Sequence, residues 1–158
     1  MLRVTKLADY GIVILTRLAR QNAATSSARD IAAVSRLPLP VVSKILKLLA
    51  RHELVASHRG IKGGYFLARR PEDITLAQVI RALEGPIAVT ECTDKIYGDC
   101  GLEKGCPVRN NWHRINHAID QALETITLAE MIRPLQTVRM DLTKTLLKER
   151  EFQAIRQG

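Results

Sequence analysis

Apolar residues recur at helical spacing in three stretches near the start of the chain. The first covers residues 6–21, and the second begins at Ser27-Ala-Arg-Asp30, a pattern that resembles a capping box. The second helix should end within Arg36-Leu-Pro-Leu-Pro40, because proline has no amide donor and restricts the residue before it. Pro40 suits the first position of a third helix, which we expect to run to about His52.

The third predicted helix has an apolar side and a basic side. Its apolar residues form a wide stripe, whereas Ser43, Lys44, Lys47 and Arg51 fall on the remaining surface. The basic residues are three and four positions apart, so they are adjacent on one side of the helix. Two helices joined by a tight turn, the second with a basic exposed face, are typical of a helix-turn-helix.

Two short strands follow, over residues 54–59 and 65–68, with a glycine-rich turn between them. A hairpin after a helix-turn-helix makes a winged helix, whose tip meets phosphates or the minor groove of DNA. A narrow minor groove attracts arginine, which favours Arg59 for that contact. We expect base edges to be read by Ser43 and Lys44, and the DNA backbone to be contacted mainly by Lys47, Arg51, Arg59 and Lys62.

The second half of the chain predicts a short helix, a loop and a long helix. Thr75 can cap a helix over residues 76–84, which Gly85 closes. After the loop, Pro107 opens a helix that reaches Thr125, with apolar residues at alternating steps of four and three. Another helix must cover such a seam. We expect a second copy of the chain to provide it, and packing within one chain is the alternative.

These elements predict a mainly α-helical fold with a small β-hairpin wing, in which a winged helix-turn-helix precedes a long dimerisation helix. A last short helix should follow the capping box in Thr127-Leu-Ala-Glu130. We divide the chain into a winged helix-turn-helix DNA-binding region (1–70), a linking helix with a cysteine cluster loop (71–106), a dimerisation helix with the short following helix (107–132), and a C-terminal tail (133–158) without an assigned function.

Basic charge is concentrated in the predicted DNA-binding region. The chain has 158 residues and a net charge of +8. Residues 1–70 contain 13 lysines and arginines against 3 acidic residues, a net charge of +10, so the remainder of the chain is net acidic. That asymmetry points to a polyanionic partner for the first half, with nucleic acid as the leading candidate. A basic surface that merely keeps the protein soluble is the alternative.

All three cysteines lie in one glycine-rich loop. Cys92, Cys100 and Cys106 are spaced C-x7-C-x5-C, among glycines and acidic residues. Burial in a core would place cysteines at helical or strand spacing, which this segment lacks. Thiolates on such a loop suit a soft metal centre, either zinc or an iron–sulfur cluster. Three unrelated buried or idle cysteines are the alternative.

The odd number of cysteines argues against a secreted disulfide framework and for a reducing cytosol, so we expect a cytoplasmic protein. No signal peptide is visible, and no apolar run approaches the roughly 20 residues that span a bilayer. The sequence has no C-x-x-C pair, no H-E-x-x-H motif and no evident nucleophile–base set. We therefore do not expect an enzyme.

The combined motifs resemble the Rrf-two family of winged-helix iron–sulfur transcriptional regulators, to which IscR-like and NsrR-like proteins belong. The resemblance covers about residues 1–132 and is carried by Leu39-Pro-Val-Val-Ser-Lys-Ile-Leu46, His58-Arg-Gly-Ile-Lys-Gly-Gly-Tyr65, the three-cysteine loop and Thr127-Leu-Ala-Glu130. Within the family, the segments that look most like the regulators of the Suf iron–sulfur assembly operon are Leu83-Glu-Gly-Pro-Ile-Ala88, Thr90-Glu-Cys92 and Cys106-Pro-Val-Arg-Asn-Asn-Trp112.

This resemblance implies a homodimer that binds a near-palindromic promoter site in double-stranded DNA and carries one cluster per subunit. The family's commoner loop is C-x5-C-x5-C, so the first interval is longer here. IscR has a histidine ligand where this chain has Arg109, and arginine stays protonated and cannot ligate iron. NsrR-like members use an aspartate of the partner's first helix, a position that Asp9 matches.

The implied ligand set favours a 4Fe–4S cluster held by Cys92, Cys100, Cys106 and Asp9 of the partner subunit. A 2Fe–2S cluster is the alternative, and His113 is the alternative fourth ligand. We therefore expect a DNA-binding repressor that senses an iron–sulfur cluster and controls Suf cluster-assembly genes. A nitric-oxide or redox-sensing repressor of the same family, or a DNA-binding protein with a structural zinc, is the alternative function. We expect the cluster-bound form to repress, and DNA binding by the cluster-free form is the alternative.

Overall fold

The computed structural model describes residues 4–21, 24–60, 63–94, 99–102 and 105–133. Within these residues the chain is mostly helical, with one antiparallel pair of strands. In chain order the elements are α1 (Lys6–Arg20), α2 (Ala28–Ser35), α3 (Leu39–Arg51), β1 (Val55–His58), β2 (Gly64–Leu67), the 3-10 helix η1 (Pro71–Asp73), α4 (Leu76–Glu84), the 3-10 helix η2 (Glu91–Thr93), α5 (Arg109–Thr125) and α6 (Leu128–Ile132).

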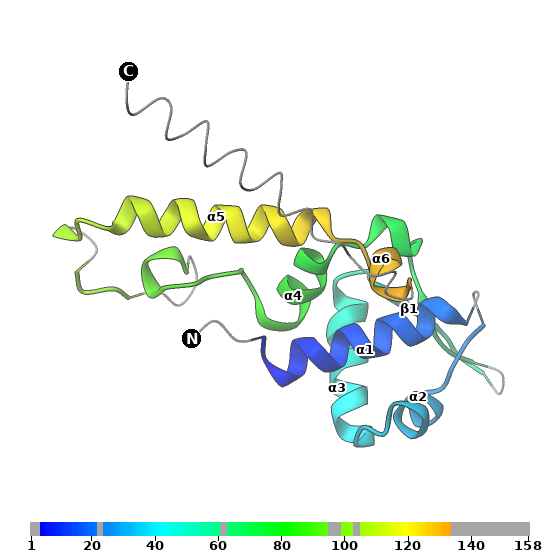
Figure 1. Cartoon of the computed structure of the whole chain (residues 1–158). Coiled ribbons are helices and arrows are strands. Elements are labelled where there is room, and N and C mark those ends of the chain that lie inside the picture. The colour runs from blue at the N-terminus through cyan, green and yellow to red at the C-terminus, as the bar shows by residue number, and fades with distance from the viewer. Residues whose placement is uncertain (1–3, 22–23, 61–62, 95–98, 103–104, 134–158) are drawn as a thin grey trace.

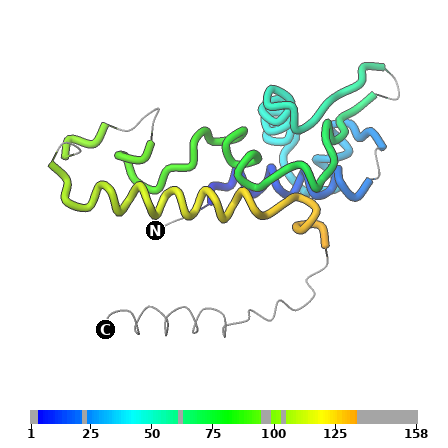
Figure 2. Tube along the Cα trace, turned by 90° about the horizontal axis from the view of Figure 1, so that it is seen from above, coloured from blue at the N-terminus to red at the C-terminus, as the bar shows by residue number. Residues whose placement is uncertain are grey.

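Helices α1, α2 and α3 form a cluster with the hairpin at its edge, and α4 and α6 pack against α1 in the same cluster (Figure 1). This arrangement is a winged helix-turn-helix followed by a long helix, and it confirms the predicted fold class. The long helix α5 lies against α4 and extends beyond the cluster. Figure 2 shows, from above, that the described residues between α4 and α5 run beside the first half of α5, toward the end of that helix that is farther from the helix-turn-helix.

Polar side chains begin four of the helices. The hydroxyl of Thr5 accepts hydrogen bonds from two amides in the first turn of α1. Ser27, Thr75 and Thr127 each form a complete capping box at the start of α2, α4 and α6. Each such cap stabilises its helix by about 1 kcal/mol, because it satisfies amides that lack a partner within the helix. The helix starts predicted at Ser27, Thr75 and Thr127 are therefore confirmed.

The turn of the helix-turn-helix depends on one residue in a left-handed conformation. Arg36 has a φ of 54° and ends α2, and the amide of Leu37 donates to the carbonyl of Ala32 at 3.1 Å. Pro38 then precedes α3, which begins at Leu39, one residue before the predicted start. The prolines therefore shape the start of α3, whereas the left-handed residue ends α2.

One hydrophobic core joins elements from both halves of the chain. The amide of Leu128 donates to the carbonyl of Ile74 at 2.8 Å, and the amide of Leu76 donates to the carbonyl of Ile126 at 2.9 Å. These bonds tie α6 to the start of α4. The division of the chain at residue 70 stays a prediction, and the core extends across it. Its buried side chains include Ile14, Leu15, Leu18, Ile31, Val42, Ile45, Leu46, Leu49, Leu54, Val55, Ile74, Val79, Ala82, Leu83 and Leu128.

The wing is anchored to the segment before α2 as well as to itself. Strand β1 pairs with β2 so that Val55 faces Leu67. The amide of Tyr65 donates to the carbonyl of Ser26 at 2.8 Å, and the amide of Ser26 donates back at 3.1 Å. A Cβ added to Gly64 would lie 2.6 Å from the carbonyl carbon of Ser26, so the close approach of the two backbones requires glycine.

The structure differs from the sequence-based expectation at two places near the cysteines. Helix α5 begins at Arg109, so Pro107 lies before the helix and does not open it. Cys92 lies within the short helix η2, so the cysteine loop is partly regular. In the described part of the chain, none of the helices combines the length and the apolar character needed to cross a bilayer.

We predict that Gly64→Ala destabilises the protein by about 1–3 kcal/mol, because the new methyl group must displace backbone and cannot be relieved by a side-chain rotation. Chemical denaturation of the purified variant measures this. Gly101→Ala is the control, since a Cβ there meets nothing within 4 Å. Equal stability of Gly64→Ala and wild type would show that the wing does not need this close approach.

Candidate nucleic-acid interface and metal centre

Helix α3 presents its predicted basic residues on one exposed face. Lys44, Lys47 and Arg51 are exposed and Ser43 is half-buried. The opposite side of the helix is fixed in the core, because its apolar side chains are fully buried. The structure therefore brings the four predicted residues of α3 together on the surface, as their spacing required. The buried side chains are Val42, Ile45, Leu46 and Leu49.

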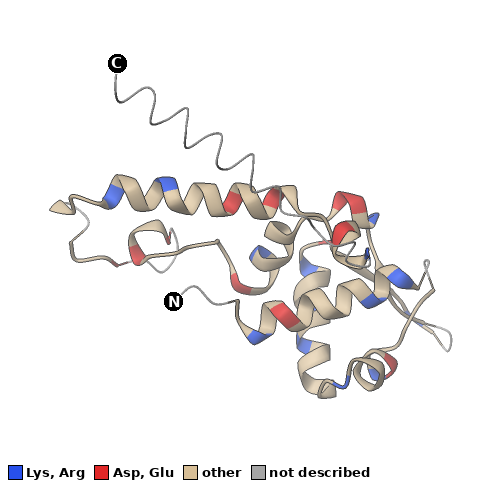
Figure 3. Ribbon diagram, viewed as in Figure 1, with Lys and Arg blue, Asp and Glu red and all other residues tan. Residues whose placement is uncertain are grey.

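The wing adds basic charge at the end of the hairpin. Arg59 is exposed and directly precedes Gly60, whose φ of 125° turns the chain at the tip. Its neighbour His58 stacks on Phe66 with ring centroids 4.7 Å apart. The predicted contact Lys62 lies outside the described residues. Figure 3 shows lysines and arginines on α3 and at both ends of α1, whereas α5 carries basic residues in its first half and acidic residues in its second.

The three cysteines are free thiols that are each half-buried. Cys92 lies in η2, and its sulfur is 3.2 Å from the hydroxyl oxygen of Thr90. Cys106 lies three residues before α5, and Cys100 lies in the described part of the loop between them. The thiols are thus accessible enough to take up a metal and chemically able to bind a soft one.

The described residues do not gather the predicted ligands into one site within a single chain. No group of three histidine, cysteine, aspartate or glutamate side chains in residues 4–133, apart from the short stretches that the structure leaves undescribed, is arranged to hold a metal ion. Asp9 lies exposed in the first turn of α1, and His113 lies exposed on α5. The ligand set of Cys92, Cys100, Cys106 and Asp9 therefore stays a prediction.

The cysteine loop is tied to α5 by the side chain of Asn116. Its Nδ2 donates to the carbonyl of Ile87 and its Oδ1 accepts from the amide of Val89, both at 2.9 Å. Further along the same side of α5, Asp120 accepts from Arg81 of α4 at 2.5 Å. These contacts join α5 to the segments on either side of Gly85.

Glu124 completes this polar side of α5. It forms an ion pair with Arg81 and accepts a hydrogen bond from the Thr75 hydroxyl at 2.8 Å. The hydrogen bond from Arg81 is the main cause that holds the pKa of the Glu124 carboxyl below its usual range, and the bond from Thr75 adds to it. The same pair, chiefly through Glu124, raises the pKa of the Arg81 guanidinium.

The sequence alone did not indicate these contacts. Asn116, Asp120 and Glu124 are four residues apart and therefore share one side of α5. That spacing was the available signal, but a polar stripe on a helix ordinarily faces water, so it did not point to a partner.

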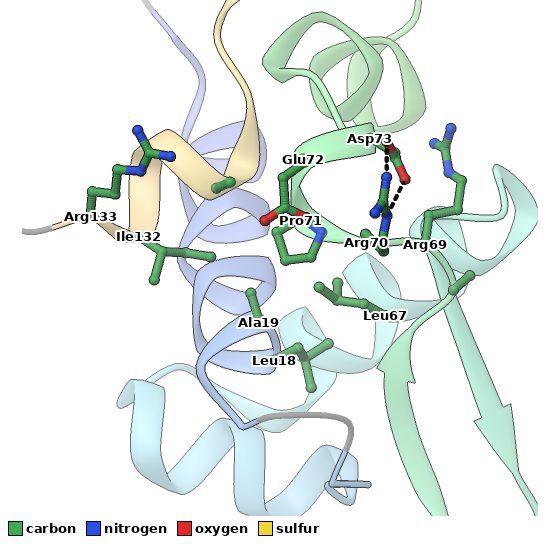
Figure 4. A pocket seen from close by; sticks show the side chains of 12 residues that line it. Leu18, Ala19, Leu67, Arg69, Arg70, Pro71, Glu72, Asp73, Ile132 and Arg133 are labelled. Atoms are coloured by element: carbon green, nitrogen blue, oxygen red, sulfur yellow. Dashed lines mark hydrogen bonds and ion pairs between the residues drawn. The ribbon is translucent and has the colours of Figure 1, made fainter.

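A groove of about 1040 Å³ lies between the end of α1, the end of β2, η1 and α6. Its apolar wall includes Leu18, Leu67 and Ile132, and at its rim Arg70 pairs with Asp73 at 3.0 Å (Figure 4). None of its lining residues is a cysteine or a histidine. We therefore assign none of the predicted metal chemistry to it.

A winged helix-turn-helix with an exposed basic α3 and a long following helix defines a class, the helix-turn-helix transcriptional regulators. The model of the Rrf2 family, described as an iron-dependent transcriptional regulator, matches residues 4–134. The chain belongs to the Rrf2 family, which confirms the resemblance drawn from its motifs. The relatives are transcriptional regulators and not enzymes, as we expected.

Similar proteins include the regulator CymR of Bacillus subtilis, which is 30% identical over 132 residues, 82% of this chain and 89% of CymR. The regulator NsrR of Geobacillus kaustophilus is 29% identical over 150 residues, 94% of this chain and 99% of that protein. Among solved structures, T. potens IscR has a TM-score of 0.64 and 29% identity, covering 88% of this chain and 92% of IscR. The similarity thus extends over nearly the whole length of these relatives.

We predict that Lys47→Ala weakens binding to all DNA sequences alike and lowers the slope of log affinity against log salt by about one unit, since one phosphate contact is lost. Binding titrations at several salt concentrations measure the slope. Arg114→Ala, on the exposed surface of α5, is the control and should leave the slope unchanged. An unchanged slope for Lys47→Ala would mean that this lysine faces solvent in the complex.

We predict that Glu124→Gln lowers the Tm at neutral pH and that its difference from wild type narrows in acid. Because the folded-state pKa of Glu124 lies below its ordinary value of 4.5, its stabilising contribution is complete above pH 4.5 and is lost as the pH falls through the lowered pKa. Partly exposed ion pairs contribute about 1 kcal/mol or less, so the shift is modest. Thermal melts from pH 7 downward test this, with Glu84→Gln as an exposed control on α4. A pH-independent difference would contradict the ion pair.

Proposed function

We propose that this protein is a homodimeric DNA-binding repressor that senses an iron–sulfur cluster and controls genes for cluster assembly of the Suf type. The observation that carries the proposal is the combination, in one chain of an iron-dependent family, of an exposed basic α3 with three free, half-buried thiols in a loop tied to α5. The family description supports dependence on iron, and the three thiols are the groups with which this chain would bind it.

The DNA-binding role rests on the surface of α3 and the wing. Ser43 and Lys44 lie toward the start of α3, where a recognition helix places its base-reading residues. Lys47, Arg51 and Arg59 are exposed cations that suit phosphate contacts. The partner is double-stranded DNA with a near-palindromic promoter site. In a two-fold dimer each copy of α3, which we call the reading helix, faces one of two matching half-sites.

The homodimer rests on the exposure of α5. None of its 17 residues is buried within one chain, although apolar residues recur along it. Ile115 is 43% exposed, and Val108 and Ile126 beside the helix ends are 45% and 37% exposed. A groove of about 480 Å³ continues this apolar surface, with Ile80 of α4 and Ile119 of α5 in its wall. A second copy of α5 covers such a seam, as heptad spacing requires.

The metal centre is proposed on the chemistry of its donors. Cys92, Cys100 and Cys106 supply three thiolates, which suit an iron–sulfur cluster, and Asp9 of the partner subunit supplies the fourth ligand. The proposed cluster is 4Fe–4S. When bound, it would supply a site with one weak oxygen ligand, open to attack by nitric oxide or oxygen. His113 lies exposed on α5 and is the alternative ligand.

The regulatory step is a change in the relative position of the two reading helices. Loop residues that hold the cluster are fixed against α5, and α5 carries the dimer contact that sets the distance between the two copies of α3. Reading helices must lie about one DNA turn apart, roughly 34 Å, so a small reorientation changes affinity strongly. The cluster-bound form has the higher affinity for the promoter and represses. The cluster-free form has the lower affinity and releases DNA.

We predict that protein purified without oxygen contains iron and sulfide, and that replacing Cys92, Cys100 and Cys106 together by serine removes both. Promoter affinity of the loaded wild type should exceed that of the triple variant by about tenfold or more, a typical coupling between two sites. Iron and sulfide analysis with a promoter-binding assay measures this, and Gly101→Ala, in the same loop, is the control. Stoichiometric zinc in colourless protein would favour a structural metal. Identical promoter binding by the triple variant would refute the switch.

A further inference from the structure

One polar side of α5 contacts both the cysteine loop and the helix-turn-helix core. Asn116, Asp120 and Glu124 form this side, which we call the polar ladder. The apolar seam occupies a different side of α5, so the ladder stays within one chain when a partner covers the seam. Asn116 binds residues that follow Gly85, whereas Asp120 and Glu124 both bind Arg81, which precedes it. Glu124 also accepts from Thr75 at the start of α4.

The first rung clamps the segment that leads into Cys92. The amide group of Asn116 makes two hydrogen bonds of 2.9 Å, one to the carbonyl of Ile87 and one from the amide of Val89. A planar amide with one donor and one acceptor edge fixes both the position and the orientation of the backbone that it binds. Asn116 is therefore the side chain that sets how residues 87–89 lie against α5.

A continuous set of hydrogen bonds connects this clamp with the sulfur of Cys92. The amide of Val89 also donates to the hydroxyl of Thr93 at 3.2 Å, and that hydroxyl donates to the carbonyl of Thr90 at 2.8 Å. Thr93 is 6% exposed, so its hydrogen bonds are largely shielded from water. The hydroxyl of Thr90 lies 3.2 Å from the Cys92 sulfur. A displacement of Cys92 therefore changes the geometry at Asn116.

The other rungs hold α4, which belongs to the core around α3. Asp120 and Glu124 both bind Arg81, whose neighbours Ala82 and Leu83 are buried in that core. A cavity of about 480 Å³ lies at the junction, and His52 at the end of α3 lines it together with Arg81, Asn116, Asp120 and Thr93. The end of the reading helix and the clamp on the cysteine loop thus share one small cavity.

We propose that Asn116 is a positioning residue that transmits the ligation state of Cys92 to α5 and, through the rungs that hold Arg81, to the reading helix α3. This inference rests on the proposed function, because it assigns a route to the switch described above. An apolar contact between loop and helix tolerates sliding, whereas a paired donor and acceptor keep one register. Loss of the clamp should therefore leave the cysteine loop and the DNA-binding surface of α3 intact. Promoter affinity should then no longer depend on whether Cys92 is ligated.

The test uses the full chain with Asn116→Ala and with Gln121→Ala as control, since Gln121 is exposed on α5 away from the ladder. In metal-free protein, hydrogen exchange of the Val89 amide should accelerate about tenfold in Asn116→Ala, because the nearer of its two acceptors is removed and only the Thr93 hydroxyl at 3.2 Å remains. Asn116→Asp keeps this acceptor and should retain the protection of Val89. It loses the donor to Ile87, so it separates the two halves of the clamp.

The second measurement is the ratio of promoter affinities between loaded and metal-free protein. We expect a ratio of about ten or more for wild type and Gln121→Ala, and a ratio within about twofold of one for Asn116→Ala. Iron content and Tm of Asn116→Ala should match the control. A purely structural role would change the Tm and leave the ratio in place.

The outcomes separate the two proposals. If wild type responds to loading and Asn116→Ala responds equally, the transmission role is wrong and the proposed function stands. If wild type itself shows the same promoter affinity loaded and metal-free, the proposed function is wrong, and the role of Asn116 falls with it. If Val89 exchange is unchanged in Asn116→Ala, the clamp does not hold in solution and the inference is overturned.

Discussion

The position of α4 between two surfaces is the constraint on which the rest of the structure depends. Its apolar side, with Val79 and Leu83, is buried in the core that also holds α1 and α3. Its other side presents Arg81 to Asp120 and Glu124 of α5. Because a closely packed core transmits displacement instead of absorbing it, α4 ties the long helix α5 to α3.

This joint at α4 connects the cysteine loop to the core of the helix-turn-helix. The described residues of the cysteine loop lie beside the first half of α5, at the end of that helix farther from the helix-turn-helix (Figures 1 and 2). The segment before Cys92 is hydrogen-bonded to α5 through Asn116, and α5 is ion-paired to α4, so the proposed switch requires no direct contact between thiols and DNA. A connection of this kind between the loop, α5 and α4 acts as a switch only if ligand binding favours one arrangement of these segments over another.

Much of the fold could be predicted from local sequence. The capping residues Ser27, Thr75 and Thr127 marked helix starts correctly, because a side-chain cap bonds amides two or three residues away. The basic face of α3 followed from spacing alone. Prediction failed at Pro107, which lies before α5, since several backbone conformations after a proline are open and neighbouring packing selects one. The polar ladder also escaped prediction, because its partners are 27–49 residues distant in sequence.

The sequence by itself determined the element types, the basic face of α3 and the three thiols in one loop, because these properties depend on residue identity and short spacing. Membership of the Rrf2 family agrees with that part. Only the tertiary structure decided that α5 leaves its seam uncovered within one chain and turns Asn116, Asp120 and Glu124 inward to the loop and α4. A periodic pattern shows which residues share a side of a helix. The side that meets a given neighbour depends on packing across the whole chain, which local spacing does not encode.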